Sequence, residues 1–280
     1  MILFKKAMAL SMHLDNARKK NQTIGFVPTM GALHQGHLAL IEACKKEADI
    51  CVCSIFVNPA QFNNPTDFKL YPSTIDKDIE VLLKGGCDAL FLPAREEMYP
   101  PGFKAKQYDL GYLEALWEGQ FRPGHFQGVC QAVDRLLGIV EPTSLYMGQK
   151  DYQQCLVIKK LLALTDREAV SLKIIPTIRE ESGLAMSSRN LRLTEEQRSK
   201  AVALYSTLGF LKSSLPVKSI TGLEKEGAAL LQRSGFNVDY VAIADADNLQ
   251  PALEVNNKKL VALIAATIGD VRLIDNMPLN

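Results

Sequence analysis

The sequence predicts an α/β protein in which a parallel-sheet domain is followed by a smaller α+β domain with antiparallel strands. In the first part of the chain, short apolar runs rich in β-branched residues alternate with segments of helical periodicity. This alternation is typical of βαβ units and a parallel sheet. Beyond about residue 177, strand-like runs follow one another across short turns such as Gly269-Asp270, and strands connected this closely must be antiparallel.

Five strands are predicted for the first sheet. They are the apolar runs at 23–27, 50–57, 89–92, 144–147 and 172–176. A helix over about 34–48 follows the first of them. In a sheet of this kind both faces are covered, crossovers are right-handed and ligands collect at the carboxyl ends of the strands. Polar residues that follow different strands are therefore expected to converge.

The second domain begins with a clear helix start. Thr194-Glu-Glu-Gln197 is a capping box that opens a helix running toward residue 213. Further elements are expected as a helix at 221–234 and strands at 238–244, 259–268 and 271–274. We therefore predict a Rossmann-like domain over 1–176 and a smaller α+β domain over 177–280, with the Ser187-Ser188-Arg189 loop at the junction.

Composition favours an ordinary globular protein. A chain of 280 residues with 47% hydrophobic and 22% charged residues can bury a substantial core. The net charge of +1 gives no general attraction to nucleic acid or membrane, so neither is expected as a partner. The apolar part of Met1-Ile-Leu-Phe-Lys-Lys6 is too short for a secretory signal, and no uncharged run reaches transmembrane length. We expect a cytoplasmic protein.

The cysteines fit that expectation. They are Cys44, Cys51, Cys53, Cys87, Cys130 and Cys155. All six fall inside apolar patterns without Cys-x-x-Cys spacing, so buried free thiols are expected rather than disulfides or zinc ligands.

The most informative segment is His34-Gln35-Gly36-His37, at the junction between the first strand and its helix. The first amides of a helix lack partners and its N-terminus is positive, so phosphate binds there readily. Side chains at i and i+3 lie on one helical face, which lets both imidazoles reach one phosphoryl group. The alternative is that His34 merely caps the helix and His37 is a satisfied polar residue of its first turn.

Four further polar segments accompany the histidines: Asn58-Pro-Ala-Gln61, Arg122-Pro-Gly-His125, Gly148-Gln-Lys150-Asp151-Tyr-Gln-Gln154 and Met186-Ser187-Ser188-Arg189-Asn190. No Gly-rich phosphate loop or dinucleotide fingerprint is present, so ATP would have to bind at the histidine turn. Together these blocks resemble the pantoate–β-alanine ligase (pantothenate synthetase) family, of the His-x-Gly-His nucleotidyl transferase superfamily. The resemblance runs from about Gly25 to Asn276.

The resemblance implies an ATP-dependent ligase that joins D-pantoate to β-alanine and releases AMP and pyrophosphate, in the synthesis of a coenzyme A precursor. The pantoate carboxylate attacks the α-phosphorus to form a pantoyl adenylate, and the amine of β-alanine then displaces AMP. Such chemistry requires fixed cations and donors around the phosphates more than a protein nucleophile. The family resemblance also implies a homodimer.

The resemblance further assigns the site residue by residue. The side chains expected to act on the phosphates are His34, His37, Lys150, Ser187, Ser188 and Arg189. ATP is expected to contact these six and also Pro28, Met30, Gly36, Gly148, Asp151 and Met186. Pantoate is expected to contact Thr29, Met30, Asn58, Gln61 and Gln154, since amides both donate to a carboxylate and accept from hydroxyls. Without the other blocks, Lys150 would be interpreted as a solvated lysine and the serine–arginine segment as an ordinary polar loop.

Several positions stay open at this point. Mg²⁺ is expected to bridge the ATP phosphates with few protein ligands, and Asp78 is the candidate carboxylate, against the alternative of a solvated helix surface. Arg122 and His125 either order the wall of the site or only pin their turn. Gln149 stands where many family members have an acidic residue, which leaves open how Lys150 is held.

Three other functions are weighed against the ligase. A nucleotidylyltransferase that leaves its nucleotide on a phosphate acceptor shares the histidine motif but does not explain the blocks at 58–61 and 150–154. A catalytically silent nucleotide binder is disfavoured by the intact histidines, lysine and serine loop. A transfer-RNA-charging enzyme is disfavoured by the balanced charge and the lack of an RNA-binding appendage.

Overall fold

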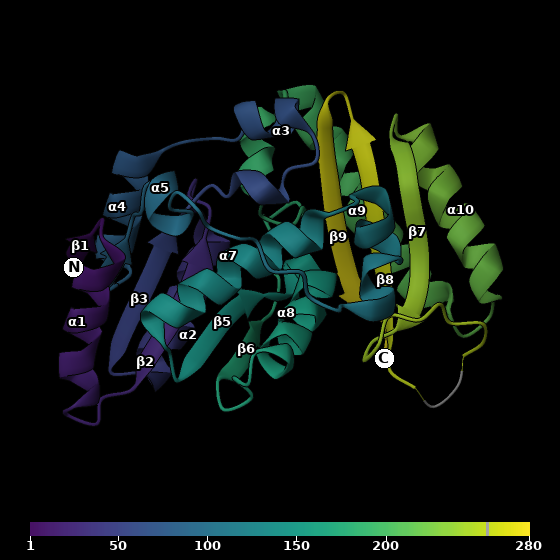
Figure 1. The fold of residues 1–280 in the computed structure, drawn as a ribbon. Coiled ribbons are helices and arrows are strands. Elements are labelled where there is room, and N and C mark those ends of the chain that lie inside the picture. Colours follow the sequence, from purple (N-terminus) through teal and green to yellow (C-terminus); the bar gives the residue numbers. More distant parts are fainter. Residues whose placement is uncertain (256–257) are drawn as a thin grey trace.

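The computed structural model describes residues 1–255 and 258–280 and contains two sheets, one in each predicted part of the chain (Figure 1). The six-stranded sheet has the order β1-β4-β3-β2-β5-β6, and every neighbouring pair is parallel. Its strands are β1 (Ile2–Phe4), β2 (Ile24–Thr29), β3 (Ile50–Ile55), β4 (Ala89–Phe91), β5 (Ser144–Gly148) and β6 (Ser171–Ile175). The predicted parallel sheet is confirmed.

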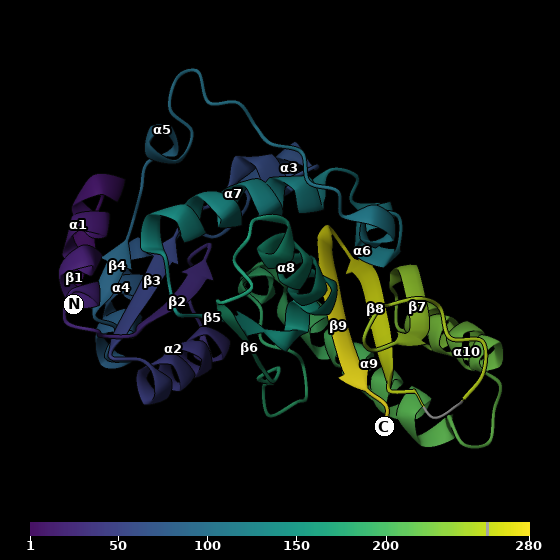
Figure 2. The ribbon, with the colours of Figure 1, turned by 60° about the horizontal axis from the view of Figure 1, so that its bottom comes forward.

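Helices cover both faces of this sheet, as Figure 2 shows with α7 above the strands and α2 below them. One face carries α1 (Ala7–Arg18), α7 (His125–Val140) and α8 (Tyr152–Leu164), and the other carries α2 (Gln35–Glu47) and α4 (Ile75–Lys84). Successive side chains of a strand point to opposite faces. Accordingly Phe26 packs in the core with Leu137, whereas its neighbour Val27 packs with Ile41 and Leu82.

The strand order reverses between β2 and β5. From β2 the chain adds β3 and β4 on one side, and then crosses to β5 and β6 on the other. In open α/β sheets, ligands bind in the crevice outside the carboxyl ends of the strands at such a reversal. The ends of β2 at Thr29 and of β5 at Gly148 therefore mark the expected site.

The second sheet is antiparallel, with the order β7-β8-β9. Its elements are β7 (Asn237–Asp245), β8 (Leu260–Ile268), β9 (Val271–Pro278) and the helices α9 (Glu195–Ser214) and α10 (Ile220–Arg233). These helices share a core with one face of the sheet, and the capping box at Thr194 is present. The other face, at Val261 and Leu263, packs against Trp117 and Tyr152 of the first part of the chain. The second sheet thus lies between its own helices and the parallel-sheet unit.

Shorter elements complete the fold. They are η1 (Pro59–Gln61), α3 (Pro65–Lys69), α5 (Arg95–Met98), η2 (Gly111–Glu114), α6 (Trp117–Phe121), η3 (Gln149–Asp151) and η4 (Ser188–Arg192). Strand β1 was not predicted: it has three residues at the edge of the sheet, too few for a periodicity to register, and it forms by pairing with β4. The domain boundary at 176/177 falls just beyond β6 and stays a prediction.

Two compositional expectations bear on the fold. All six cysteines are buried free thiols, as predicted. Within residues 1–255 and 258–280, no helix has the length and apolar character needed to span a bilayer.

Candidate active site

A cavity of about 220 Å³ lies at the carboxyl ends of β2 and β5. Its lining includes every residue predicted to contact ATP or pantoate: Pro28, Thr29, Met30, His34, Gly36, His37, Asn58, Gln61, Gly148, Lys150, Asp151, Gln154, Met186, Ser187, Ser188 and Arg189. These residues come from distant segments that the topology brings to one edge of the sheet.

The two histidines form a compact pair at the start of α2. The rings of His34 and His37 lie 4.1 Å apart between centroids. His34 Nδ1 accepts from the amide of Gly36 at 3.1 Å, and His37 Nδ1 accepts from the amide of His34 at 3.2 Å. His34 does cap the helix, but each ring uses only one nitrogen for this. Capping and ligand binding are therefore compatible in the same residues.

Protonation of the pair follows from these contacts. Burial and the nearby Lys150 charge lower the pKa of His34 to about 4. Burial, His34 and Lys150 hold the pKa of His37 well below its ordinary value. Both rings are neutral near pH 7, and because Nδ1 accepts in each, the proton lies on Nε2. The pair thus carries two Nε2–H donors and adds no charge to the site.

Gly36 is required by the geometry of His34. A Cβ at position 36 would lie 2.9 Å from His34 Cε1 and 3.0 Å from its Nδ1. A side chain there would displace the imidazole that accepts the Gly36 amide. The glycine of His-x-Gly-His therefore makes room for the first histidine.

Asp78 supports the turn that precedes the histidines. The turn contains Gly31 and Ala32, both with positive φ. The carboxylate of Asp78 accepts from the amides of Ala32 at 2.9 Å and Leu33 at 2.8 Å, and from the hydroxyl of Thr74 at 3.0 Å.

These contacts correct both interpretations of Asp78. The residue is 1% exposed, so the solvated helix surface is wrong. It does not line the cavity, and its two oxygens are occupied by protein donors, so the geometry does not support it as a magnesium ligand. Ala32 and Leu33, whose amides it binds, lie about 45 positions away in sequence, and no local pattern signals these two contacts.

Lys150 enters the cavity from η3, directly after β5. Its side chain is 17% exposed, and its ammonium lies 3.9 Å from a carboxylate oxygen of Asp151. The backbone of η3 is held by Asn276 of β9, whose Nδ2 donates to the carbonyls of Gln149 at 3.0 Å and Lys150 at 2.8 Å. Sequence reasoning did not identify Asn276. The available signal was a pair of polar residues, Asp275-Asn276, inside an apolar strand.

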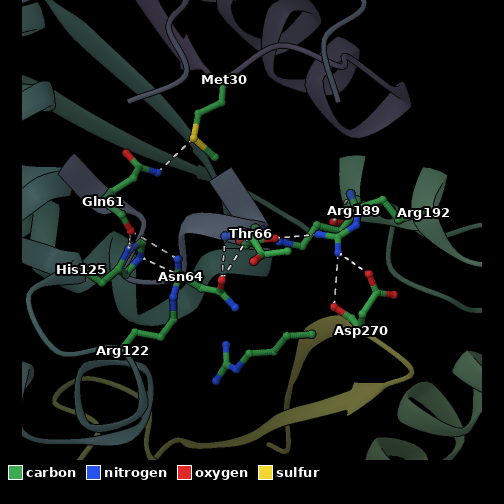
Figure 3. A network of polar contacts seen from close by, with 12 residues as sticks. Met30, Gln61, Asn64, Thr66, Arg122, His125, Arg189, Arg192 and Asp270 are labelled. Carbon is green, nitrogen blue, oxygen red and sulfur yellow. Dashed lines mark hydrogen bonds and ion pairs between the residues drawn. The ribbon is translucent and has the colours of Figure 1, made fainter. Parts of the chain in front are cut away.

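Gln61 also lines the cavity, and Figure 3 shows its side chain directed at Met30. Its Nε2 donates to the thioether of Met30 at 3.0 Å, and its Oε1 accepts from Asn58 at 3.1 Å. Asn58 is 1% exposed and also binds the carbonyl of Gly128 and the hydroxyl of Tyr99, so its polar atoms are occupied. A thioether is a weak acceptor, which leaves the Gln61 amide available to a stronger one.

Arg122 and His125 order this wall of the site. His125 Nδ1 donates to the carbonyl of Gln61 at 2.7 Å, while its Nε2 accepts from Arg122 at 3.1 Å. Burial and the Arg122 charge lower the pKa of His125 to about 3, so the ring is neutral. The first of the two alternatives for these residues is confirmed, because they fix the backbone of Gln61 (Figure 3).

The serine–arginine loop is docked over the cavity. Ser188 Oγ donates to the carbonyl of Ala32 at 3.0 Å, and Ser187 Oγ accepts from the amide of Arg189 at 3.3 Å. Arg189 donates to Asp67 of α3 at 2.9 Å, an aspartate that Arg192 also binds, at 2.8 Å. Asp67 was not foreseen, because its partners lie more than a hundred positions away.

A buried ionic network lies beside the cavity and joins the two sheets. Glu118 of α6 accepts two bonds from Arg272 of β9, at 2.6 and 2.8 Å, and one from the hydroxyl of Tyr240 at 2.9 Å. Burial opposes ionisation of Glu118, but the Arg272 bonds and charge outweigh it and hold its pKa at about 2. Arg122 lies 3.6 Å from the same carboxylate. Glu118 and Arg122 are four positions apart, but no local pattern signals the contacts of Glu118 with Tyr240 and Arg272, which lie more than 120 positions away.

The donor set of the cavity bears on the expected metal. Among the described residues that line it, Asp151 is the one carboxylate. A single carboxylate beside a phosphate site suits a Mg²⁺ ion held mainly by ATP and water.

Comparison with known proteins agrees with the resemblance. A sequence model of the pantoate–β-alanine ligase family matches residues 2–278. This chain belongs to the pantoate–β-alanine ligase family. Pantothenate synthetases from Cytophaga hutchinsonii and Moorella thermoacetica are 42% and 43% identical to it, with 99–100% of the chain and 99% of each relative covered. The family's reaction, which forms pantothenate by ligation, is the activity of this enzyme.

Solved structures support the same fold. Pantothenate synthetase from Thermus thermophilus superposes with a TM-score of 0.93 at 39% identity, covering 100% of this chain and 99% of that one. The pantoate–β-alanine ligase from Francisella tularensis, solved in complex with beta-gamma ATP and β-alanine, gives a TM-score of 0.84 at 36% identity, covering 100% and 98%. The parallel sheet followed by a small antiparallel sheet is thus a family architecture.

Proposed function

We propose that this ligase condenses D-pantoate with β-alanine through a pantoyl adenylate in the cavity between β2 and β5. The observation that carries this proposal is the convergence of two uncharged histidines, a lysine and two glutamines in one cavity at the reversal of strand order. In the first step a pantoate carboxylate oxygen bonds to the α-phosphorus of ATP, and the bond from that phosphorus to the bridging oxygen of pyrophosphate breaks.

The phosphates bind beside α2 and η3. The Nε2–H groups of His34 and His37 donate to phosphate oxygens, and the Lys150 ammonium neutralises charge that builds up on the departing pyrophosphate. Neutral imidazoles are suited to this role because they donate without adding repulsion to the nearby lysine. The backbone at Pro28, Met30, Gly36, Gly148 and Met186, with Asp151, forms the rest of the ATP contacts.

The serine–arginine loop covers the phosphates. Ser188 already docks the loop on the turn before α2, so that Ser187 and Arg189 lie at the cavity. When ATP binds, Arg189 exchanges the Asp67 carboxylate for a phosphate oxygen. A closed loop protects the adenylate from water.

Pantoate binds at the Gln61 end, next to Thr29 and Met30. Among the described residues the side-chain amide of Gln154 makes no hydrogen bond, so it is available, as is the Gln61 amide that now donates to a thioether. Asn58 acts by holding Gln61. In the second step the β-alanine nitrogen bonds to the pantoyl carbonyl carbon, AMP leaves as the bond from that carbon to the phosphate oxygen breaks, and the amine loses a proton.

Magnesium accompanies ATP in this proposal. When bound, it neutralises phosphate charge and aligns the pyrophosphate for departure. Asp151 is the side chain of this protein that would approach it.

We also propose, from the family resemblance, that the enzyme is a cytoplasmic homodimer. Light scattering of the purified protein tests the dimer.

The order of steps is tested by isotope exchange. If adenylation precedes amine attack, labelled pyrophosphate enters ATP when enzyme, Mg²⁺ and pantoate are present and β-alanine is absent. Omitting pantoate abolishes the exchange, because in the proposed first step the attacking carboxylate belongs to pantoate.

Each contrary result has a distinct meaning. Exchange without pantoate indicates another acceptor, as in a nucleotidylyltransferase. Pantothenate synthesis without exchange contradicts a reversible adenylate. A folded protein that binds ATP but gives neither exchange nor pantothenate is a silent binder.

A further inference from the structure

The backbone carbonyls of η3 accept hydrogen bonds from a side chain of the second sheet, and these bonds hold η3 in place. Asn276 is 2% exposed and lies in β9, yet its amide nitrogen donates to the carbonyls of Gln149 and Lys150, more than 120 positions away. In the part of the chain that the structure describes, these are the only side-chain bonds to the η3 carbonyls. The η3 turn itself has no side-chain cap.

Asn276 is in turn rigidly held. Its backbone amide donates to Asp275 Oδ1 at 2.8 Å, and its carbonyl accepts from Arg179 at 3.2 Å. Arg179 also binds Asp275 through two bonds of 2.6 and 3.0 Å and stacks 4.6 Å above the ring of Tyr205. These contacts fix the backbone of Asn276, and the fixed backbone places its side-chain amide against η3.

The same anchor reaches the stem of the serine–arginine loop. Arg179 forms a β-bridge with Ala185, the residue before Met186. The Asp275-Asn276 pair therefore contacts η3 on one side and, through Arg179, the loop stem on the other. Both segments carry groups of the ATP site.

We infer that Asn276 is the positioning residue of Lys150: its two bonds to the η3 carbonyls set where the lysine ammonium lies relative to the phosphates. This inference rests on the proposed adenylation. It gives the second sheet a defined role in that step, through a residue that is absent from the lining of the cavity proposed to bind ATP and pantoate.

Asn276→Ala tests the inference by pyrophosphate exchange. Loss of two hydrogen bonds to the backbone is expected to lower the exchange rate roughly tenfold or more. The loss appears in kcat, whereas the KM for pantoate stays within about twofold of the wild type, because the Gln61 end is untouched. Asn276→Asp keeps the size but faces two carbonyls with an acceptor, so it loses at least as much. Asn276→Ser, which retains one donor, loses less.

A double-mutant cycle separates positioning from general support of the fold. If Asn276 acts through Lys150, then Asn276→Ala lowers the residual exchange of Lys150→Ala by less than about twofold. Asn248→Ala is the matched control, since it deletes an Asn bond to the amide of Gln250 elsewhere in the second part of the chain and leaves exchange unchanged. Multiplicative losses in the double variant overturn the inference. Absence of exchange in the wild type contradicts the proposed function instead.

Discussion

The two sheets differ in the direction in which their polar groups point. In the parallel sheet, the segments after β2, β3 and β5 direct His34, Gln61 and Lys150 into the cavity. In the antiparallel sheet, Arg272 directs its guanidinium at the carboxylates of Glu118 and Asp239, and Asn276 directs its amide nitrogen at two carbonyls. In our proposal the first sheet carries the residues that act on the substrates, and the second holds those residues in place.

Topology explains the difference. All carboxyl ends of a parallel sheet lie at one edge, so loops from distant strands meet there. Neighbouring antiparallel strands run in opposite directions and their loops alternate between edges. The second sheet therefore reaches the site through residues within β9.

The largest expected effect is on stability, and it separates the two roles. Arg272→Ala leaves the Glu118 carboxylate buried without its two strongest donors. We expect the free energy of unfolding to fall by about 3 kcal/mol, while kcat per folded molecule stays within a few-fold of the wild type. Urea denaturation and steady-state assays measure the two quantities. A large loss of kcat at unchanged stability would show that Arg272 acts on the reaction and not on the fold.

The opposite pattern is expected in the first sheet. Lys150→Ala and His37→Ala each remove a donor to the reacting phosphates and should slow adenylation by roughly 10²-fold or more. Their melting temperatures should stay close to that of the wild type, because neither side chain fills the core. Single-turnover adenylation at a near-normal rate in a folded Lys150→Ala protein would show that Lys150 takes no part in adenylation.

This difference also explains what could be predicted from the sequence. Strands, helices and the His34–His37 turn depend on local patterns, and the carboxyl-end rule then gathers the site residues without any knowledge of contacts. The supporting contacts do not arise from local patterns. Asn276 lies 126 positions from Lys150, and Glu118 lies 154 positions from Arg272. No periodicity links such pairs. The role of Asp78 was mispredicted for the same reason, because the amides that it binds at Ala32 and Leu33 are distant in sequence.

Acid is expected to weaken the first sheet's site. His125 has a pKa of about 3 in the fold against about 6.5 in the unfolded chain. Between these values the unfolded chain binds a proton that the folded one does not. The contribution of His125 to the free energy of unfolding is therefore complete above pH 6.5 and declines as the pH falls. His125 alone contributes a slope of up to about 1.4 kcal/mol per pH unit. Denaturation of wild type and His125→Asn between pH 6.5 and 4.5 should give a shallower slope for the variant, and equal slopes would contradict the assignment.

The smallest expected effect concerns Gln149, the neighbour of Lys150 in η3. Its side chain makes one long contact, 3.4 Å to Asn276 Oδ1, whereas its backbone carbonyl is held by Asn276 Nδ2 at 3.0 Å. Only the backbone contact positions η3 in our account, so an acidic side chain at 149 should matter little. We expect Gln149→Glu to change kcat by less than roughly tenfold, or about 1.4 kcal/mol of barrier, and by less than Asn276→Ala does. A loss as large as that of Lys150→Ala would show that the side chain of residue 149, and not its backbone carbonyl, determines the position of the Lys150 ammonium.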